Sequence, residues 1–394
     1  MKEWSALLFA IAAVAQAQPS SCNTAEPSPS FTVDLRGNPF RAVVTRDGCW
    51  IFASVGQNIA VLKRQGGNIT LSRTVPAEGN GSRGGIAGIV LTHDQKLLIG
   101  AATSGAVFLD VDALISNSGK PNLGFIPSDP TDRPTGSVYA NVTADDKRLF
   151  ISEESAQSIT VIDLERARRD GYNRDAIIGR IPTGIAPIAL TFSPDEKWLY
   201  ATSEGGSPAW NWPSTCNNNR LPAGAVVVID VARARTDPAQ SVVSKVPAGC
   251  DAVRDAISPK GDRLYVTSRG ANRVLTFDTE KLRTDPDHAL LRATTVGPAP
   301  VPIAVIDGGR RILAGNSNRF ARGNGPETLT VLDAAKIESG GDAVLGTIPT
   351  GAFPREMDVS ADGNTLFLTN AGSHSLQIID LQRLPLAPSA AKRE

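Results

Sequence analysis

Arginines and carboxylates recur at matched positions of a segment that repeats along this chain. Aligning the repeats places at one position Arg41, Gly88, Tyr139, Ala189, Arg254 and Glu356. Two residues further along lie Val43, Asn141, Thr191, Ala256 and Asp358. Residues two apart in a strand share a face, so both sets should point the same way. Arg355 and Asp255 are sequence neighbours of the first set.

These residue types suggest a ligand site in a narrow channel. The basic members are Arg41, Arg254 and Arg355, and the acidic members are Glu356, Asp358 and Asp255. The arginines could hold the oxygens of an anionic or oxygen-rich ligand, and Tyr139 could donate a hydrogen bond to it. A carboxyl whose pKa is raised by burial could transfer protons. The alternative is a wet channel in which arginines and carboxylates pair with one another, because pairing satisfies polar groups without any ligand.

The longest loop, residues 204–225, carries a different kind of candidate. Trp210 and Trp212 lie in it beside glycines and asparagines. Exposed aromatic side chains on a loop can cover apolar or sugar-like ligands. Packing of the loop onto its own strands explains the two tryptophans equally well.

Several common chemistries lack the residues they need. The chain has three histidines and neither an HExxH nor a GxSxG motif, so we expect no metal site and no Ser/His/Asp triad. Gly79–Gly84 matches GxGxxG but leads into the apolar strand 86–91 rather than a helix, which argues against nucleotide binding. We therefore predict a protein without cofactors.

The elements that position these residues follow from the repeat. Residues 181–202 reappear as 348–369, and the third strand of most copies ends in an apolar run followed by aspartate. These aspartates are Asp110, Asp163, Asp230, Asp278, Asp333 and Asp380. Alternating apolar residues between Pro-Asp and Asp-Gly turns indicate four short strands per copy, with short helical segments after the third strand, such as 164–169 and 231–235.

Seven copies of the second and third strands predict an all-β, seven-bladed propeller with four-stranded blades. A single four-stranded sheet cannot bury both faces, so the blades pack around a ring and cover most sheet edges. Residues 31–35 should pair as the outer strand of blade seven and close the ring. The propeller is predicted to span residues 31–384, followed by a tail, 385–394.

The N-terminal residues indicate export. A charged start, an apolar run and Ala15-Gln16-Ala17 predict a signal peptide over 1–17, followed by an N-terminal segment, 18–30, and secretion. No other apolar stretch approaches the about 20 residues that span a bilayer. With 40 basic and 40 acidic residues, no general field favours nucleic acid or a membrane surface. We expect a monomer with a small-molecule ligand.

Cysteines and sequons test this strand assignment. Four cysteines in an oxidising compartment predict two disulfides, and each pair must meet on one face. The expected pairs are Cys22 with Cys49, opposite the mouth, and Cys216 with Cys250, at the mouth. Asn68 and Asn80 are predicted glycosylation sites. The sequon at Asn141 lies inside an inner strand, where a sugar would block ring closure.

The repeat resembles the YVTN family of propellers over about residues 31–384. Tyr265-Val-Thr-Ser and Phe367-Leu-Thr-Asn are its nearest versions of the name motif. Related propellers include lactonases and muconate-type cyclases, and the secreted, Pro- and Gly-rich style resembles fungal propellers near secondary-metabolite genes, including the trichothecene type. The motif is specific for architecture and weak for function.

Together these features predict a secreted propeller that binds a small oxygenated organic molecule, such as a secondary metabolite or a lactone, at the channel mouth. If it is an enzyme, the expected reaction is cyclisation, isomerisation or lactone hydrolysis without a cofactor. The alternative is a non-catalytic extracellular binding protein for a cell-wall glycan or a protein partner.

Overall fold

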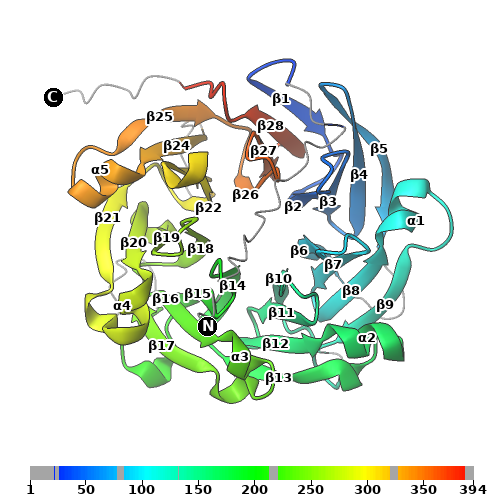
Figure 1. The fold of residues 1–394 in the computed structure, drawn as a ribbon, viewed down its shortest axis with the longest axis horizontal. Helices are drawn as coiled ribbons and strands as arrows, with labels where there is room; N and C mark the ends of the chain where they lie inside the picture. Colours follow the sequence, from blue (N-terminus) through cyan, green and yellow to red (C-terminus); the bar gives the residue numbers. More distant parts are fainter. Residues whose placement is uncertain are drawn as a thin grey trace, which may run out of the picture.

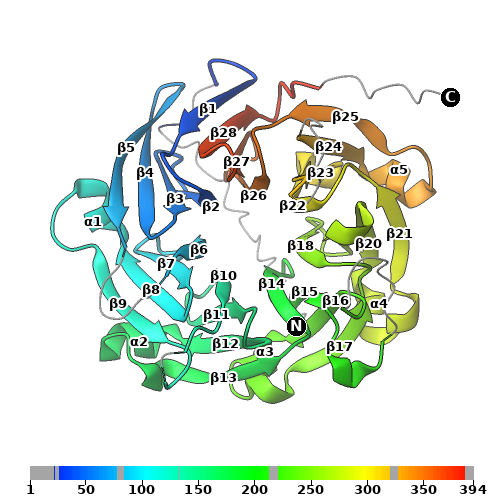
Figure 2. The same ribbon diagram turned by 180° about the vertical axis from the view of Figure 1, so that it is seen from behind.

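Seven antiparallel four-stranded sheets are arranged as blades in a ring in the computed structural model (Figures 1 and 2). The structure describes Cys22 and residues 26–77, 84–131, 133–212, 221–319 and 327–386. The predicted all-β, seven-bladed propeller is confirmed. The strands nearest the centre are β2, β6, β10, β14, β18, β22 and β26.

Each blade runs from its inner to its outer strand in chain order, except the last. Blades one and two are β2 (Pro39–Val44), β3 (Trp50–Val55), β4 (Asn58–Gln65), β5 (Asn68–Pro76), and β6 (Ile86–Leu91), β7 (Leu97–Ala102), β8 (Gly105–Asp110), β9 (Asn122–Pro127). Blades three and four are β10 (Ser137–Val142), β11 (Arg148–Glu153), β12 (Ser158–Asp163), β13 (Ile177–Pro182), and β14 (Ile185–Phe192), β15 (Trp198–Gly205), β16 (Ala225–Asp230), β17 (Val242–Pro247). Blades five and six are β18 (Ala252–Ile257), β19 (Arg263–Ser268), β20 (Arg273–Asp278), β21 (Leu290–Thr295), and β22 (Pro300–Ile306), β23 (Arg311–Asn316), β24 (Thr328–Asp333), β25 (Val344–Pro349).

The two ends of the propeller meet in blade seven. This blade contains β26 (Pro354–Val359), β27 (Thr365–Asn370) and β28 (Ser375–Asp380), and its outer strand is β1 (Ser30–Asp34). β1 pairs antiparallel with β28 from Ser30 opposite Ile379 to Asp34 opposite Ser375. The predicted closure of the ring by the N-terminal strand is therefore confirmed, with the strand beginning at Ser30.

The aspartate that ends a third strand is a helix cap. In five blades this side chain accepts a hydrogen bond from a backbone N–H in the first turn of a short helix, which is the role that favours aspartate at an N-cap. The helices are α1 (Val111–Ser116), α2 (Leu164–Asp170), α3 (Val231–Ala234), α4 (Thr279–Thr284) and α5 (Ala334–Ser339). Single 3-10 turns are η1 (Arg174–Ala176), η2 (Pro208–Trp210), η3 (Pro238–Gln240), η4 (Arg269–Ala271), η5 (Pro286–His288) and η6 (Asp307–Gly309).

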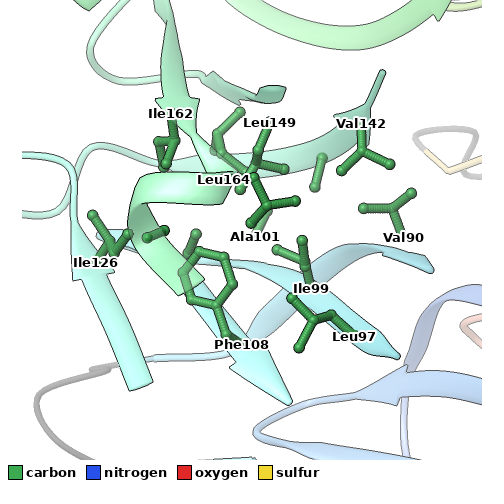
Figure 3. Close-up of a cluster of buried hydrophobic side chains, with 14 of the residues drawn as sticks. Val90, Leu97, Ile99, Ala101, Phe108, Ile126, Val142, Leu149, Ile162 and Leu164 are labelled. Atoms are coloured by element: carbon green, nitrogen blue, oxygen red, sulfur yellow. The ribbon is translucent and has the colours of Figure 1, made fainter. Parts of the chain in front are cut away.

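The hydrophobic core lies between neighbouring blades. In the cluster between blades two and three, Ile99 and Phe108 of one blade pack with Leu149 and Ile162 of the next, and α2 adds Leu164 (Figure 3). Strands buried on both faces have nearly continuous apolar sequences, as in β7, whose six residues are all buried. This packing holds the inner strands in place around the channel.

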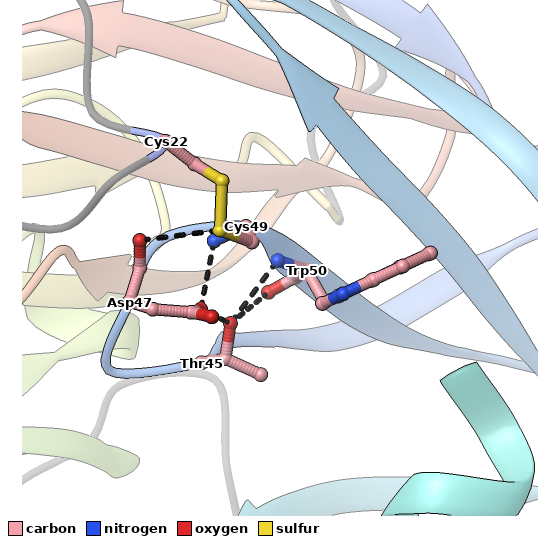
Figure 4. The surroundings of a disulfide bond; sticks show 5 residues. All are labelled: Cys22, Thr45, Asp47, Cys49 and Trp50. Atoms are coloured by element: carbon pink, nitrogen blue, oxygen red, sulfur yellow. Dashed lines mark hydrogen bonds between the residues drawn. A yellow bond between two sulfur atoms is a disulfide. The ribbon is translucent and has the colours of Figure 1, made fainter. Parts of the chain in front are cut away.

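A disulfide joins the N-terminal segment to the first hairpin. Cys22 and Cys49 are bonded, with their Cα atoms 5.0 Å apart, as predicted. Cys49 lies in the turn between β2 and β3, where its N–H donates to Asp47 Oδ1 at 2.9 Å (Figure 4). Cys250 is also disulfide-bonded, but its predicted partner, Cys216, lies outside the described residues, so that pairing stays a prediction.

The structure describes the residues of the remaining sequence predictions only in part. Asn68 is exposed at the start of β5, whereas Asn80 and the predicted signal peptide lie outside the described residues. Asn141 is part-buried in β10, and its Nδ2 donates to the carbonyl of Leu190 in the next blade at 3.0 Å. Glycosylation of Asn68 and Asn80 stays a prediction. Within the described ranges no helix is long and apolar enough to cross a membrane.

Candidate functional site

The strand register places the aligned residues at one level of the channel. Ala42, Asp255 and Met357 each pair with the fourth residue of their blade's second strand, namely Ala53, Val266 and Leu368. The residues that precede them, Arg41, Arg254 and Glu356, are therefore equivalent in blades one, five and seven. In each of these blades the ladder has an irregularity just before this point, which is typical of a β-bulge that redirects side chains.

Hydroxyl groups of the second strands hold these positions. Thr267 Oγ1 accepts from the N–H of Arg254 at 3.1 Å and donates to the carbonyl of Val301 in the next blade at 2.9 Å. Thr369 Oγ1 likewise accepts from the N–H of Glu356 at 3.1 Å and donates to the carbonyl of Phe40 in blade one at 2.8 Å. Thr267 is the third residue of the Tyr265–Ser268 motif. The hydroxyl of this repeat motif thus fixes a channel residue and joins two blades.

We predict that Thr267→Val lowers the free energy of unfolding by about 1 to 3 kcal/mol, because it leaves a buried N–H and a buried carbonyl without the hydroxyl that binds both. Valine has nearly the same shape, so little packing is lost. Urea unfolding of the variant should be compared with Thr74→Val, a change at an exposed position of β5 that should stay within about 0.5 kcal/mol of the parent. Equal stabilities of the two variants would contradict the role assigned to Thr267.

An apolar collar narrows the channel near its mouth. It is formed by buried inner-strand residues from several blades that pack into one cluster: Phe40, Val138, Ile188, Val253 and Val301, with Ala87, Tyr139 and Phe353 packed against them. The carbonyls of Phe40, Ala87, Ile188, Val253 and Val301 are also the acceptors of the second-strand hydroxyls. These hydrogen bonds from side chain to backbone therefore tie these collar positions to the neighbouring blades.

Next to the collar, Arg254 and Glu356 form a buried ion pair. The Arg254 guanidinium donates from Nε and Nη2 to Glu356 Oε1, and the two residues are only 5% and 4% exposed. Tyr139 lies beside them, its ring centroid 5.4 Å from Arg254 and 4.6 Å from Arg41. Burial raises the pKa of the Tyr139 hydroxyl to about 12, which keeps it a hydrogen-bond donor. Here the structure shows the pairing that was one of the two alternatives from the sequence.

Two further carboxyls of the channel wall have raised pKa values. Burial raises the pKa of Asp255 to about 7, although Thr191 Oγ1 donates to its Oδ1 at 2.7 Å and Arg254 favours the charged form. Burial likewise raises the pKa of Asp358 to about 6, opposed by the Arg41 guanidinium. Both groups can therefore take up and release protons near neutral pH. Within the described ranges no three His, Cys, Asp or Glu side chains are grouped as metal ligands.

Above the collar the channel opens into a cavity of about 560 Å3, a volume that suits a small molecule. Its charged lining residues are Glu154, Glu204, Arg269, Arg319 and Arg355, and Phe40, Ala87 and Val138 of the collar also line it. A smaller space of about 40 Å3 shares several of these residues and reaches Arg254. Two of the site residues predicted from the sequence, Arg254 and Arg355, are among the described residues that line these two spaces.

Four charged lining residues were missed by the sequence alignment, which followed only the inner strands. Glu154, Glu204 and Arg269 are each the seventh residue counted from the start of a second strand, as are Gly56 and Thr103, which also line the cavity. This position follows the motif that repeats in every blade, so the signal was present in the sequence. Arg319 lies in the loop between β23 and β24 and has no equivalent in the repeat.

Comparison with known proteins supports the fold. No family model matches the chain. A stretch of 135 residues is 25% identical to hydrazine synthase subunit beta of Kuenenia stuttgartiensis and covers 29% of this chain and only 35% of that subunit. A solved chain of Kuenenia stuttgartiensis hydrazine synthase matches with a TM-score of 0.64 and 16% identity, over 87% of this chain and 95% of that one. The two share a propeller fold. At this identity the likeness shows nothing more.

The tryptophans of the long loop pack on their own part of the molecule. Trp210 and Trp212 are half-buried against the core cluster of blades three and four, with ring centroids 4.9 Å apart. Lys245 of β17 lies 5.0 Å from the Trp210 ring, and Trp212 packs so closely on Gly206 that a Cβ there would clash. This arrangement is the packing alternative considered from the sequence. A ligand-covering role for the two residues stays a prediction.

The site therefore has two levels. At the mouth, charged side chains surround a cavity that has the apolar collar as its floor. Among the inner strands below, Arg254, Glu356, Asp255 and Asp358 lie with Arg41 and Tyr139, held by contacts between blades. The first level can bind a ligand, and the second can hold protons.

Proposed function

We propose that this propeller binds a small, oxygenated organic molecule in the cavity at the channel mouth. The supporting observation is the cavity itself, whose volume of about 560 Å3 combines an apolar floor with charged walls. Arg355 supports an oxygen-bearing ligand in particular, because it lines the cavity and makes no ion pair with any described residue. Such a guanidinium keeps its N–H donors available for a carboxylate, carbonyl or hydroxyl oxygen.

Binding is better supported than turnover at this site. The proton-transfer candidates Asp255, Asp358, Glu356 and Tyr139 are absent from the described lining of the cavity, and the collar lies between that cavity and the deeper channel. The three most exposed large apolar side chains of the blades, Leu123, Val243 and Leu290, lie on the outer strands of three different blades. This arrangement gives no support to a broad protein-binding patch.

We further propose that the protein acts as a monomer outside the cytoplasm. The Cys22–Cys49 disulfide supports this compartment, because structural disulfides persist in oxidising environments and are rare in the cytosol.

The binding proposal can be tested with a mixture of small organic acids, amino acids, sugars and lactones, using saturation-transfer NMR on the full chain. Ala87→Phe would fill the cavity from its floor, and Thr103→Trp would obstruct it from the rim. Ala144→Phe, in an exposed turn on the opposite face, is the matched control. We expect signals with the parent and the control and their loss in a folded cavity variant. No signal with the parent, or equal signals in all variants, would refute the proposal.

A further inference from the structure

Two opposite charges at the mouth face the cavity without an ion pair to any residue that the structure describes. Glu154 follows β11 and Arg355 lies in β26, and both line the cavity. In the described part of the chain, neither side chain makes a hydrogen bond, and neither has an opposite charge within 4.0 Å. By contrast, Arg269 pairs with Glu204 at 3.0 Å, and Arg254 pairs with Glu356. Among the described residues, Glu154 and Arg355 therefore line this cavity without an ion pair.

The two unpaired charges influence each other across the space between them. Burial raises the pKa of Glu154, the nearby Glu204 raises it further, and Arg355 acts in the opposite direction. Burial and the neighbouring Arg254 lower the pKa of Arg355 to about 10, while Glu154 opposes this change. Each group is thus partly desolvated and has no direct counter-ion in the described part of the chain, which is an unfavourable state for a charge.

Aromatic rings hold the Arg355 guanidinium in place. The centroid of Phe40 lies 3.9 Å from its Cζ atom, and that of Phe353 lies 5.4 Å away. Rings contact the faces of a guanidinium, whereas its N–H donors lie in its plane, so stacking leaves those donors available for a carboxylate. Phe40 also belongs to the apolar collar, which offers a surface to the carbon skeleton of a ligand.

We propose that the ligand is a small zwitterionic aminocarboxylate, whose carboxylate binds Arg355 and whose ammonium group binds Glu154. The inference rests on the proposed function, since it specifies the chemical class of the molecule held in the same cavity. Such a ligand supplies each unpaired charge with its counter-ion in one binding event. Glu154 and Arg355 form no ion pair with each other within 4.0 Å, so the two charges of the ligand should be separated by a carbon chain.

The test uses calorimetric titration of the full chain with glycine, β-alanine, γ-aminobutyrate and ε-aminocaproate, which separate the same two charges by increasing lengths. Butyrate and butylamine each carry only one of the charges of γ-aminobutyrate. We expect at least one aminocarboxylate to bind about tenfold or more tightly than either singly charged compound, because each charged hydrogen bond contributes that much.

Two variants assign the charges. Glu154→Gln should weaken the aminocarboxylate about tenfold while leaving butyrate unchanged, and Arg355→Gln should weaken both. Arg263→Gln, which removes an arginine from the start of β19 away from the cavity, should change neither. The proposal of a zwitterionic ligand would be overturned if butyrate and every aminocarboxylate bound equally tightly, or if Glu154→Gln bound the aminocarboxylate as tightly as the parent does. Either result would leave the proposal of binding at the mouth intact. The zwitterion proposal would also be overturned if the mixture of organic acids, amino acids, sugars and lactones yielded a ligand that has no ammonium group and no longer binds the Ala87→Phe variant.

Discussion

Replacing Arg254 by leucine should lower the free energy of unfolding by about 3 to 5 kcal/mol, because it leaves the Glu356 carboxylate buried without its counter-ion. Glu356→Gln should also destabilise, since it leaves the guanidinium of Arg254 without a charged partner. The pair joins blades five and seven across the channel, so its loss affects contacts that no single blade can restore. Urea unfolding and the thermal midpoint of each variant measure the effect.

Two controls separate a buried pair from arginine loss in general. Arg311→Leu removes an arginine whose one ion pair among the described residues, with Asp307 at 3.2 Å, is partly exposed, and it should cost about 1 kcal/mol or less. The double variant Arg254→Leu with Glu356→Leu should be less destabilised than the sum of the single changes, because it leaves no isolated charge. Two single variants as stable as the parent would show that the pair is dispensable and would return Arg254 to the list of free ligand-binding groups.

Asp255→Asn should stabilise the protein at alkaline pH and have little effect at acidic pH. Burial raises the pKa of Asp255 from 3.8 to about 7, so the folded protein holds a proton that the unfolded chain has lost between these values. The free energy of unfolding of the parent therefore falls as the pH rises from about 4 to about 7 and is level above that. A shift of about three pKa units corresponds to roughly 4 kcal/mol.

Asparagine keeps an oxygen that can accept the hydrogen bond from Thr191, so the variant removes the charge with little change in shape. Asp358 remains in both proteins, and the difference in unfolding free energy between them isolates Asp255. Denaturation series from about pH 5 to about pH 8 should show this difference growing up to about pH 7 and staying constant above it. Asp112→Asn, an exposed change in α1, controls for the loss of one negative charge. A difference that does not vary with pH would show that Asp255 ionises as it does in water.

Much of the architecture could be predicted because its signals are local and repeated. The alternation of apolar residues sets the strands, and the recurrence of the unit sets the number of blades. Even the positions of Arg41, Arg254 and Glu356 follow from counting along the inner strands, since the register is the same in each blade. The aspartate that ends the third strand of most blades was visible as a marker, and in five blades the structure explains it as a helix cap.

The site depends more on which blades face one another. Nothing in the local sequence says that Arg254 reaches Glu356 two blades away while Arg355, the neighbour of Glu356, stays without an ion pair among the described residues. Glu154 was not considered, because it lies beyond the second strand and becomes a cavity residue only when the ring closes. Trp210 and Trp212 could pack or cover a ligand, and only the fold of their loop against the blade places them in the core cluster.

By itself the sequence determined the seven-bladed ring, its closure by the N-terminal strand and the Cys22–Cys49 bond, because each depends on a repeated period or on which face a turn occupies. The tertiary structure decided which charges are paired, which carboxyls are buried and which residues line the cavity. The physical reason is that a strand period specifies only the side of the sheet on which a side chain lies. The neighbours of that side chain across the channel come from other blades, whose approach is set by the packing of the whole ring.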